Sequence, residues 1–325
     1  MFLAEDFKSW IKILSVNLHQ VYSMKKATVI GVGNLGSCIA YELAARGIVT
    51  ELVLIDLYRE LAEGNAEDIA QAMAFRSNVE VTAGDYEDAE GSQVVIVTAG
   101  KPRTPDMKSR MDLLEANIRI IKSVASNLKK IREEPIVVTL TNPVDVMNYA
   151  MWKLTGFDRR RVIGSAGMLD SARFRRAISR KLDVPVLDVE AYVLGEHGDR
   201  QVPVFSRVAV KGEKRAFSDE ERKEITEEIR QSALNVISKK GGTVYAPASN
   251  TVNMVRMILE DVPGLAVCSV VLDGEYGLKD ISIGVPVELS REGVKRIFEW
   301  KLDEDEKAIF YKGAENLKKV IKTVM

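Results

Sequence analysis

The sequence is poor in several residue types, and each shortage argues against a class of protein. The 325 residues include only two cysteines, Cys38 and Cys268, whose separation matches no metal-ligand spacing. So few cysteines favour a reducing compartment, and we therefore expect a cytoplasmic protein without a bound metal. No run of about 18 apolar residues is present, which argues against a helix that spans a membrane.

Neither sign of charge is in excess. The chain has 46 Lys and Arg against 47 Asp and Glu, a formal net charge of −1 at pH 7. This balance argues against a nucleic-acid partner bound by general neutralisation of its phosphates. Hydrophobic residues make up 46% of the chain, which is enough for an ordinary buried core. The length suggests about two domains, since a typical domain has ~150 residues.

Histidine is equally scarce, because the chain contains only His19 and His197. His19 belongs to residues 1–24, an N-terminal extension with apolar residues at approximately helical spacing. This extension is either an amphipathic helix that packs on the protein or on a partner subunit, or a start assigned too early. In the second case Met24, just before the first predicted strand, would be the first residue. We assign no chemistry to the extension. Any histidine chemistry is therefore expected at His197.

From Lys25 onward, strand-like and helix-like segments alternate, as in a parallel sheet with crossover helices. Residues 25–164 are predicted to form a doubly wound Rossmann α/β domain, with strands at 27–31, 51–55, 94–97 and 135–140. Its predicted helices are 34–46, a long helix that follows the second strand and ends at Ala74, and 111–131. Residues 165–325 are predicted to form an α+β domain, with helices at 169–182, 219–239, 249–259 and the C-terminal end, and strands at 188–193, 202–210 and, paired, 266–287.

A glycine-rich segment follows the first predicted strand and begins the first helix. It has the pattern G-x-G-x-x-G and reads Gly31-Val32-Gly33-Asn34-Leu35-Gly36. The first glycine permits a tight turn, the second lets backbone amides approach a pyrophosphate, and the third allows helix and strand to pack closely. The N-terminus of the helix then offers N–H groups to phosphates. The context predicts a dinucleotide site more strongly than the motif alone.

Asp56 ends the second predicted strand, 25 residues after Gly31. A carboxylate at this position accepts hydrogen bonds from the adenosine ribose hydroxyls and repels a 2′-phosphate. We therefore expect NAD as the cofactor rather than NADP. The alternative is that Asp56 only caps the following helix.

Several further motifs, in a fixed order, carry a resemblance to a known family. Residues 25–325 resemble the lactate/malate dehydrogenase family in Val97-Thr98-Ala99-Gly100, Thr141-Asn142-Pro143, Leu169-Asp170-Ser171-Ala172-Arg173, Gly195-Glu196-His197-Gly198-Asp199, and Tyr276-Gly277-Leu278-Lys279-Asp280 through Gly284-Val285-Pro286. The resemblance implies NAD as cofactor and a small hydroxy acid as substrate.

The resemblance also implies catalytic roles for His197, Asp170 and Arg110. Oxidation of a secondary alcohol needs a base for the hydroxyl proton, and an imidazole with a pKa near neutrality serves in both directions. Asp170 would hold the second ring nitrogen and stabilise the imidazolium. Arg110 matches an arginine in a mobile loop that polarises the substrate carbonyl and contacts the substrate.

Substrate contacts follow from the same resemblance. Arg173 comes three residues after Asp170, on the same face of a predicted helix, and matches the arginine that binds the substrate carboxylate with two parallel hydrogen bonds. Its neighbours Arg175, Arg176 and Arg180 are expected on the solvated face. Asn142 would contact substrate and cofactor, unless it only forms the turn before a proline. Thr243 is expected to line the pocket. The remaining cofactor residues implied are Thr98, Ala99, Gly100, Asn117, Leu140, Thr141 and Asn142.

The loop at 101–110 contains the residue that distinguishes substrates in this family. In this family, enzymes that act on lactate have glutamine at this position, whereas enzymes that act on malate have an arginine, which pairs with the second carboxylate. Counted forward from Gly100 the position is Arg103, and counted backward from Arg110 it is Thr104, because the loop is one residue longer than usual. We favour Arg103, because an arginine can pair with the second carboxylate of the substrate. A loop closed over the methyl group of pyruvate would instead leave this charge unpaired, at a cost of several kcal/mol. The alternative is a generally basic, solvated loop with Lys101 and Lys108.

These residues together predict an NAD-dependent enzyme that interconverts L-malate and oxaloacetate. The closest alternative is an L-lactate dehydrogenase or a relaxed 2-hydroxyacid dehydrogenase. Two more distant alternatives fit the residues less well. An NAD-dependent glycosidase would need a metal held by Cys and His. A non-catalytic NAD-binding subunit would not need the catalytic and substrate-binding residues His197, Asp170, Arg173 and Arg110. The substrate is expected to be a small dicarboxylate, with no nucleic-acid or membrane partner. The family resemblance implies a homotetramer, or alternatively a homodimer.

Overall fold

The computed structural model describes residues 24–101 and 110–325. The predicted N-terminal extension up to residue 23, and Arg103 and Thr104, lie outside these residues. Within the described part, the chain first builds a parallel sheet in the order β3-β2-β1-β4-β5-β6. Its strands are β1 (Lys26–Ile30), β2 (Glu51–Ile55), β3 (Glu80–Ala83), β4 (Val94–Val97), β5 (Ile136–Thr139) and β6 (Val162–Gly164).

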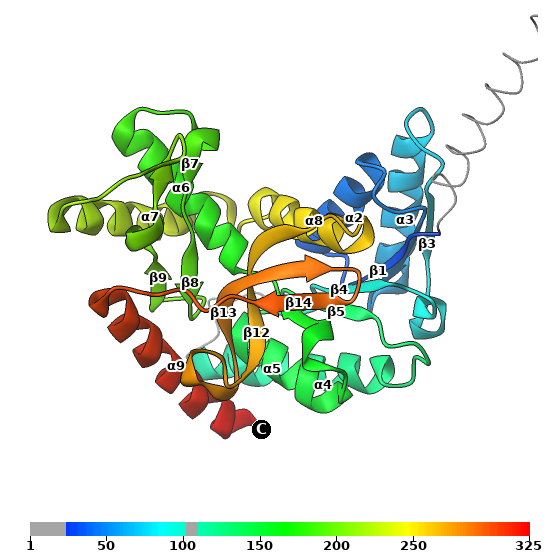
Figure 1. Cartoon of the computed structure of the whole chain (residues 1–325). Helices are drawn as coiled ribbons and strands as arrows, with labels where there is room; N and C mark the ends of the chain where they lie inside the picture. The colour runs from blue at the N-terminus through cyan, green and yellow to red at the C-terminus, as the bar shows by residue number, and fades with distance from the viewer. Residues whose placement is uncertain (1–23, 102–109) are drawn as a thin grey trace, which may run out of the picture.

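Helices cover both faces of this sheet, which is why its central strands are continuous apolar runs. Every residue of β4 and β5 is buried, as expected for strands covered on two sides. Figure 1 shows α2 on one side of the sheet and α4 and α5 on the other. The helices are α2 (Asn34–Ala45), α3 (Arg59–Met73), α4 (Arg110–Leu128) and α5 (Val144–Thr155).

The second half of the chain extends the same sheet with antiparallel strands. β12 (Gly264–Asp273) pairs with β6, and β13 (Lys279–Ser290) pairs with β12. β13 also pairs with β14 (Gly293–Ile297) and with β8 (Val193–Gly195), which pairs with β9 (Gln201–Pro203). A small separate sheet has the order β11 (Glu213–Lys214), β10 (Ala209–Val210), β7 (Val189–Glu190).

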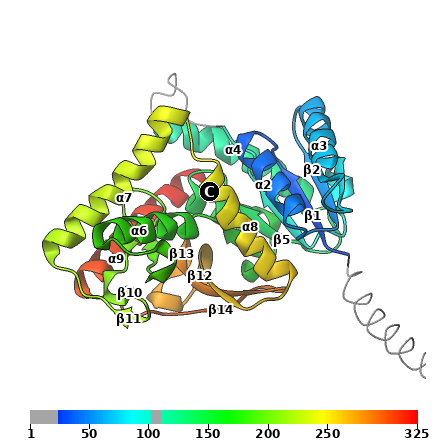
Figure 2. The same cartoon turned by 90° about the horizontal axis from the view of Figure 1, so that it is seen from above.

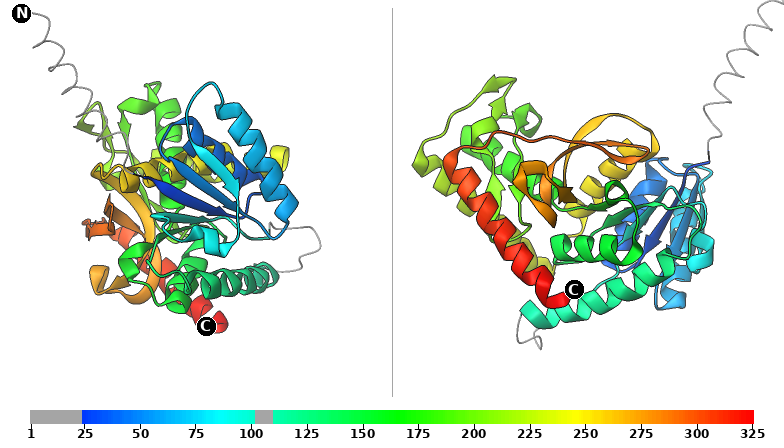
Figure 3. Two further views of the ribbon diagram at one scale, coloured as in Figure 1. Left: turned by 90° about the vertical axis from the view of Figure 1, so that its right-hand side faces the viewer. Right: turned by 60° about the horizontal axis from the view of Figure 1, so that its bottom comes forward.

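Long helices surround this antiparallel part. They are α6 (Gly167–Leu182), α7 (Asp219–Lys240), α8 (Tyr245–Leu259) and α9 (Glu304–Val324). In Figure 2, α6 and α7 lie side by side, and α8 runs beside α2. The C-terminal helix α9 packs against β8, β9 and β13 (Figure 3). Short 3₁₀ turns occur at Tyr86–Ala89, Arg159–Arg161, Val186–Asp188, Phe205–Arg207 and Glu275–Gly277.

A hydrophobic cluster that is separate from the main core holds α6 in place. Phe174 of α6 packs edge-on against Phe205 at 4.9 Å between ring centroids, and Phe205 against Phe217 at 5.5 Å. Ile225 and Ile229 of α7 complete this cluster, and all five side chains are buried. The apolar face of α6 is therefore anchored between the small sheet and α7, so that the opposite face of the helix has a defined orientation.

Some predicted elements were wrong or missing. The predicted strands 188–193 and 202–210 are each broken. Two residues without regular structure separate β7 from β8, and the 3₁₀ turn Phe205–Arg207 separates β9 from β10. β3, β6, β14 and α5 were not predicted. α5 is buried along most of its length, so its sequence has no polar face that would reveal a helical period. The α/β class and the Rossmann arrangement of the first half were predicted correctly. No helix among residues 24–101 and 110–325 has the length and apolarity that crossing a membrane requires.

Gly36 gives a direct test of the tight packing at the glycine loop. A Cβ at this position would lie 1.9 Å from the Gly31 carbonyl oxygen and 2.7 Å from Thr98 Oγ1. Gly36→Ala should therefore lower the free energy of unfolding by about 3 kcal/mol or more, measured by chemical denaturation.

Gly64, inside α3, is the matched control, because a Cβ there meets no atom within 4 Å. Gly64→Ala should stabilise the protein by about 1 kcal/mol through helix propensity. Equal effects of the two substitutions would contradict the packing that the structure shows at Gly36.

Candidate active site

The carboxyl ends of β1, β4 and β5 form one edge, since these strands are parallel neighbours. The chain passes from β1 outward to β2 and β3, then returns to β4 on the other side of β1. This reversal is the topological switch point at which doubly wound sheets bind ligands. The segments that follow these three strands contain most of the predicted cofactor residues, while Asp56 follows β2 and Asn117 belongs to α4.

The glycine loop has the geometry that its sequence predicts. Gly31 has a φ of +92° and donates its N–H to the Ile55 carbonyl at 2.7 Å, while a Cβ there would lie 2.5 Å from the Ala99 nitrogen. α2 begins directly after Gly33, which has no side chain to cap the helix. A Cβ at Gly33 would meet nothing within 4 Å, so the backbone there is open to a ligand. These features fit a pyrophosphate at the start of α2.

Asp56 lies at the end of β2 and organises the loop. Its Oδ2 accepts the Val32 N–H at 2.8 Å and its Oδ1 the Tyr58 N–H at 3.0 Å. Tyr58, not Asp56, stands at the N-cap position of α3. The helix-cap alternative is therefore wrong for Asp56, whose carboxylate joins the glycine loop to the second strand.

Asn117, from α4, joins the loops after β4 and β5. Its Oδ1 accepts the Lys101 N–H at 2.7 Å, and its Nδ2 donates to the Asn142 carbonyl at 2.7 Å. Thr141 Oγ1 donates to the Ala99 carbonyl at 2.7 Å, and Thr98 Oγ1 donates to the Gly31 carbonyl. The predicted cofactor residues thus hold one another in a continuous hydrogen-bonded rim.

His197, Asp170 and Arg173 meet in the second half of the chain. His197, in the turn between β8 and β9, has its Nδ1 2.6 Å from Asp170 Oδ2. Arg173 Nη1 lies 2.9 Å from Asp170 Oδ1, one turn further along α6. The Asp170 side chain is 3% exposed, whereas those of His197 and Arg173 are 22% and 16% exposed. Asp170 is therefore the buried centre of the cluster, and Nε2 is the ring nitrogen left for a substrate.

The charges around His197 raise its pKa. Burial alone lowers the pKa of the imidazole, and the charge of Arg173 lowers it further. The charge and hydrogen bond of Asp170, together with the charge of Asp145, outweigh both and raise the pKa above its ordinary value. The imidazolium is thus a stable species in this site, as a group that alternately accepts and returns a proton needs.

For the other predicted substrate residues, the described part of the structure gives their positions in the fold. Asn142 is exposed and is followed by a cis peptide bond to Pro143. Thr243 is half-buried in the connection between α7 and α8. Arg110 is the first residue of α4, and its side chain lies outside the described part.

The expectation that the neighbours of Arg173 all lie on a solvated face was wrong for Arg175. Arg176 and Arg180 are exposed, but Arg175 is half-buried. Its guanidinium stacks over the Tyr192 ring at 5.1 Å, and its Nε donates to the Ala191 carbonyl at 3.2 Å. Arg175 therefore helps to attach α6 to the chain that leads into β8.

Asp145 is a buried residue of the site that the sequence did not predict. Its Oδ2 accepts the backbone N–H of His197 at 2.8 Å, and its Oδ1 accepts from Ser269 Oγ at 2.5 Å. The residue is 2% exposed. A charged residue within the otherwise uncharged run 135–152 was the signal available in the sequence.

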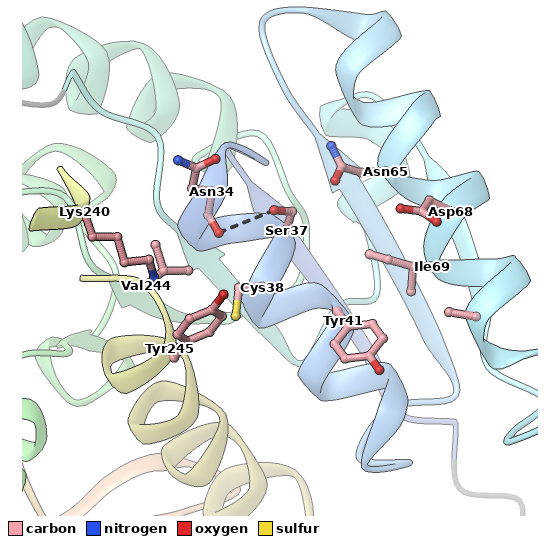
Figure 4. Close-up of a pocket in the computed structure, with 11 residues that line it drawn as sticks. Asn34, Ser37, Cys38, Tyr41, Asn65, Asp68, Ile69, Lys240, Val244 and Tyr245 are labelled. Carbon is pink, nitrogen blue, oxygen red and sulfur yellow. Dashed lines mark hydrogen bonds between the residues drawn. The ribbon is translucent and has the colours of Figure 1, made fainter. Parts of the chain in front are cut away.

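A cavity of about 440 Å³ lies beside the glycine loop (Figure 4). It is lined by α2, α3 and the start of α8, with Asn34, Cys38, Asp68 and Tyr245 among its residues. It contains no member of the His197 cluster, so we do not assign it to the chemical step. No group of three His, Cys, Asp or Glu among the described residues is arranged to hold a metal ion.

The chain belongs to the lactate/malate dehydrogenase family. The family model for the NAD-binding domain matches residues 25–164, and the model for the alpha/beta C-terminal domain matches residues 167–325. This confirms the resemblance inferred from the motifs.

Proteins named malate dehydrogenase and proteins named L-lactate dehydrogenase are both similar to the chain along most of its length. It is 44% identical to a malate dehydrogenase of Halobacterium salinarum, covering 90% of this chain and 97% of the relative. It is 37% identical to an L-lactate dehydrogenase of Latilactobacillus sakei, covering 91% and 94%.

Solved structures confirm the fold. The structure of a minor L-lactate dehydrogenase from Enterococcus mundtii matches with a TM-score of 0.89 at 33% identity, covering 94% of this chain and 99% of that one. A malate dehydrogenase from Cryptosporidium parvum matches with a TM-score of 0.87 at 33% identity, covering 93% and 99%.

The raised pKa of His197 makes stability depend on pH in a definite direction. A histidine whose pKa is raised on folding stabilises the protein fully below its unfolded pKa of about 6.5, and this contribution is lost as the pH rises through the folded value. The stability difference between the unaltered chain and His197→Asn should therefore shrink as the pH is raised from about 6.5 through the raised pKa of the folded state. Chemical denaturation across this range measures it, and a difference that grows with pH would contradict the raised pKa.

Proposed function

We propose that the chain is an NAD-dependent L-malate dehydrogenase, which transfers a hydride reversibly between L-malate or oxaloacetate and NAD(H). One observation carries the proposal: a buried carboxylate, Asp170, contacts both the imidazole of His197 and the guanidinium of Arg173. The imidazole is suited to accept a proton and the guanidinium to bind a carboxylate. The oxidation of a 2-hydroxy acid requires both functions at one place.

In this proposal His197 exchanges the proton. As L-malate is oxidised, the proton of its C2 hydroxyl moves to Nε2 of His197 and the C2–O bond becomes the carbonyl of oxaloacetate. NAD, when bound, supplies the acceptor for the C2 hydride. Asp170 keeps Nδ1–H bonded and stabilises the imidazolium as it forms. In the reverse direction the imidazolium returns the proton to the carbonyl oxygen.

Three arginines bind and polarise the substrate. Arg173 holds the carboxylate next to the reacting carbon, and its ion pair with Asp170 fixes its orientation. Arg110 polarises the carbonyl, and Arg103 pairs with the distal carboxylate of malate. Asn142 and Thr243 complete the substrate contacts. The roles of Arg103 and Arg110 rest on the family motif, because their side chains lie outside the described part.

The strand ends described above supply the cofactor site. The residues proposed to hold NAD are Gly31, Val32, Gly33, Asn34, Leu35, Gly36, Asp56, Thr98, Ala99, Gly100, Asn117, Leu140, Thr141 and Asn142. Two features of the site favour NAD over NADP. Asp56 would repel a 2′-phosphate, and the nearby Arg59 is engaged by Glu63 at 3.0 Å and Asp85 at 2.9 Å.

The second candidate is an L-lactate dehydrogenase or a relaxed 2-hydroxyacid dehydrogenase. The 37% identity to proteins named L-lactate dehydrogenase favours it. A non-catalytic NAD-binding subunit fits less well, since such a protein has no use for His197, Asp170 and Arg173 in contact.

Assembly and location are further parts of the proposal. We propose a homotetramer or homodimer, because large apolar side chains are exposed around α3 and α8: Leu57 by 92%, Tyr58 by 70% and Tyr245 by 72%. Sedimentation equilibrium measures this state, and a monomer would contradict it. A cytoplasmic location agrees with free thiols at Cys38 and Cys268.

The decisive assay compares kcat/KM for oxaloacetate and pyruvate, each with NADH and with NADPH. Oxaloacetate with NADH should exceed pyruvate with NADH by about a thousandfold, because only a doubly charged substrate pairs every guanidinium in the closed site. A preference for pyruvate would overturn the malate assignment in favour of the second candidate.

Arg103→Gln should shift the ratio of kcat/KM for oxaloacetate to that for pyruvate strongly toward pyruvate, by about a hundredfold or more. Lys108→Gln, in the same loop, removes an equal charge and should leave the ratio nearly unchanged. An unchanged ratio in Arg103→Gln would move the selectivity role to Thr104 or elsewhere. Equal shifts in both variants would favour a generally basic loop.

A further inference from the structure

His197 contacts a second buried carboxylate besides Asp170. Asp145, near the start of α5, accepts the backbone N–H of His197 at 2.8 Å, while Asp170 of α6 contacts the ring at 2.6 Å. The two acids come from opposite halves of the chain: Asp145 follows the predicted cofactor residue Asn142 by three positions. His197 is therefore held from the cofactor side through its backbone and from the substrate side through its ring.

A chain of buried hydrogen bonds points at the carboxylate of Asp145. Ser269 Oγ donates to Asp145 Oδ1 at 2.5 Å, because an ionised carboxylate can only accept. Ser282 Oγ then donates to Ser269 Oγ at 2.9 Å, and Asn148 Nδ2 donates to Ser282 Oγ at 3.0 Å. All four residues are at most 2% exposed. The chain of donors from Asn148 through Ser282 and Ser269 thus ends at the carboxylate of Asp145.

Such a network is costly to bury in a core that could be apolar. It links three elements, because Asn148 and Asp145 belong to α5, Ser269 to β12 and Ser282 to β13. Asn148 Nδ2 also donates to the Ser269 carbonyl at 3.0 Å. The helix that follows the cofactor loop is thereby fixed to the antiparallel strands of the second half, and the carboxylate at its end holds His197.

The turn that carries His197 needs such an anchor. Gly195 has a φ of +86°, and its only register partner on β13 is Gly284. Asn316 of α9 donates to the Glu196 side chain at 3.0 Å, and the His197 backbone N–H donates to Asp145. A displacement of about 1 Å at a reacting group can cost on the order of a hundredfold in rate.

Charge adds to this geometry. The ionisable groups that act on His197 are Asp170, Asp145 and Arg173, and those that act on Asp145 are His197 and Glu196. Burial raises the pKa of Asp145 to about 6, although the hydrogen bonds from Ser269 and from the His197 backbone lower it. Above that pH, Asp145 is a second negative charge beside the imidazole.

We propose that Asp145 is a positioning residue for the proton transfer. Its carboxylate holds the backbone of His197 in place and supports the imidazolium electrostatically, and so couples the cofactor loop to the group that exchanges the proton. The kinetic part of this inference rests on the malate dehydrogenase activity proposed above. The electrostatic part concerns the imidazole alone and can be measured without turnover.

Asp145→Asn tests the electrostatic part. Its amide oxygen can still accept the His197 N–H, and its NH2 group can donate to Ser269 Oγ, so the variant removes the charge and preserves the size. With ¹³C-labelled histidine, the ring signals of His197 are followed by NMR as the pH is raised. Only His19 gives another such signal, and His197→Asn distinguishes the two. We expect a lower imidazole pKa in Asp145→Asn, together with a fall in kcat on the order of tenfold and a smaller change in KM.

Glu306→Gln is the matched control. Glu306 is 3% exposed and, like Asp145, accepts a backbone N–H and a serine hydroxyl, both from Ser206. This variant should lose stability without changing the pKa of His197. An unchanged imidazole pKa in Asp145→Asn, or an equal change in Glu306→Gln, would overturn the proposal. If the unaltered chain reduced neither oxaloacetate nor pyruvate, the proposed function would fail, while the NMR result would still decide the role of Asp145.

Should Asp145→Asn not fold, the unaltered chain provides the test. The backbone amide of His197 should exchange slowly with solvent, and its NMR signal should move as Asp145 titrates near pH 6. An amide that exchanges as fast as that of an exposed loop residue would overturn the proposal.

Discussion

The shared carboxylate of Asp170 is the interaction on which the candidate site depends. Its two oxygens lie 2.6 Å from His197 Nδ1 and 2.9 Å from Arg173 Nη1, and only 3% of its side chain is exposed. A carboxylate buried this deeply is stable when it is paired and costly when it is not. The pairing holds the imidazole in one tautomer and the guanidinium in one orientation. Without Asp170, the imidazolium and the guanidinium would lie near each other with no counter-ion between them.

The fold brings these groups together by extending one sheet across both halves of the chain. β6 ends the parallel strands, and α6 starts directly after it with Asp170 in its first turn. β12 and β13 continue the sheet to β8, whose end carries His197. The phenylalanine cluster beneath α6 fixes the helix, and α5 connects the cofactor loop to the same strands. The geometry of the site is therefore a consequence of strand order and of two packed helices.

Local signals in the sequence were enough for part of this description. The glycine loop, Asp56 and the three-residue spacing of Asp170 and Arg173 are short-range patterns. The structure places them after β1, after β2 and on one face of α6, while their functional roles stay predictions. The contact between Asp170 and His197 spans 27 residues and came from the family resemblance, since spacing cannot show it. Asp145 was missed because its partners lie 52 and 124 residues away, and α5 because it is buried on nearly all sides. The selectivity role of Arg103 stays a prediction.

The most direct test of the central claim is the rate of oxaloacetate reduction with NADH by Asp170→Asn. If Asp170 serves both His197 and Arg173, kcat should fall on the order of a thousandfold and KM for oxaloacetate should rise, since proton transfer and carboxylate binding are lost together. Circular dichroism of the same samples establishes that the variant is folded. A folded variant whose kcat and KM both lie within about twofold of the unaltered chain would contradict the account.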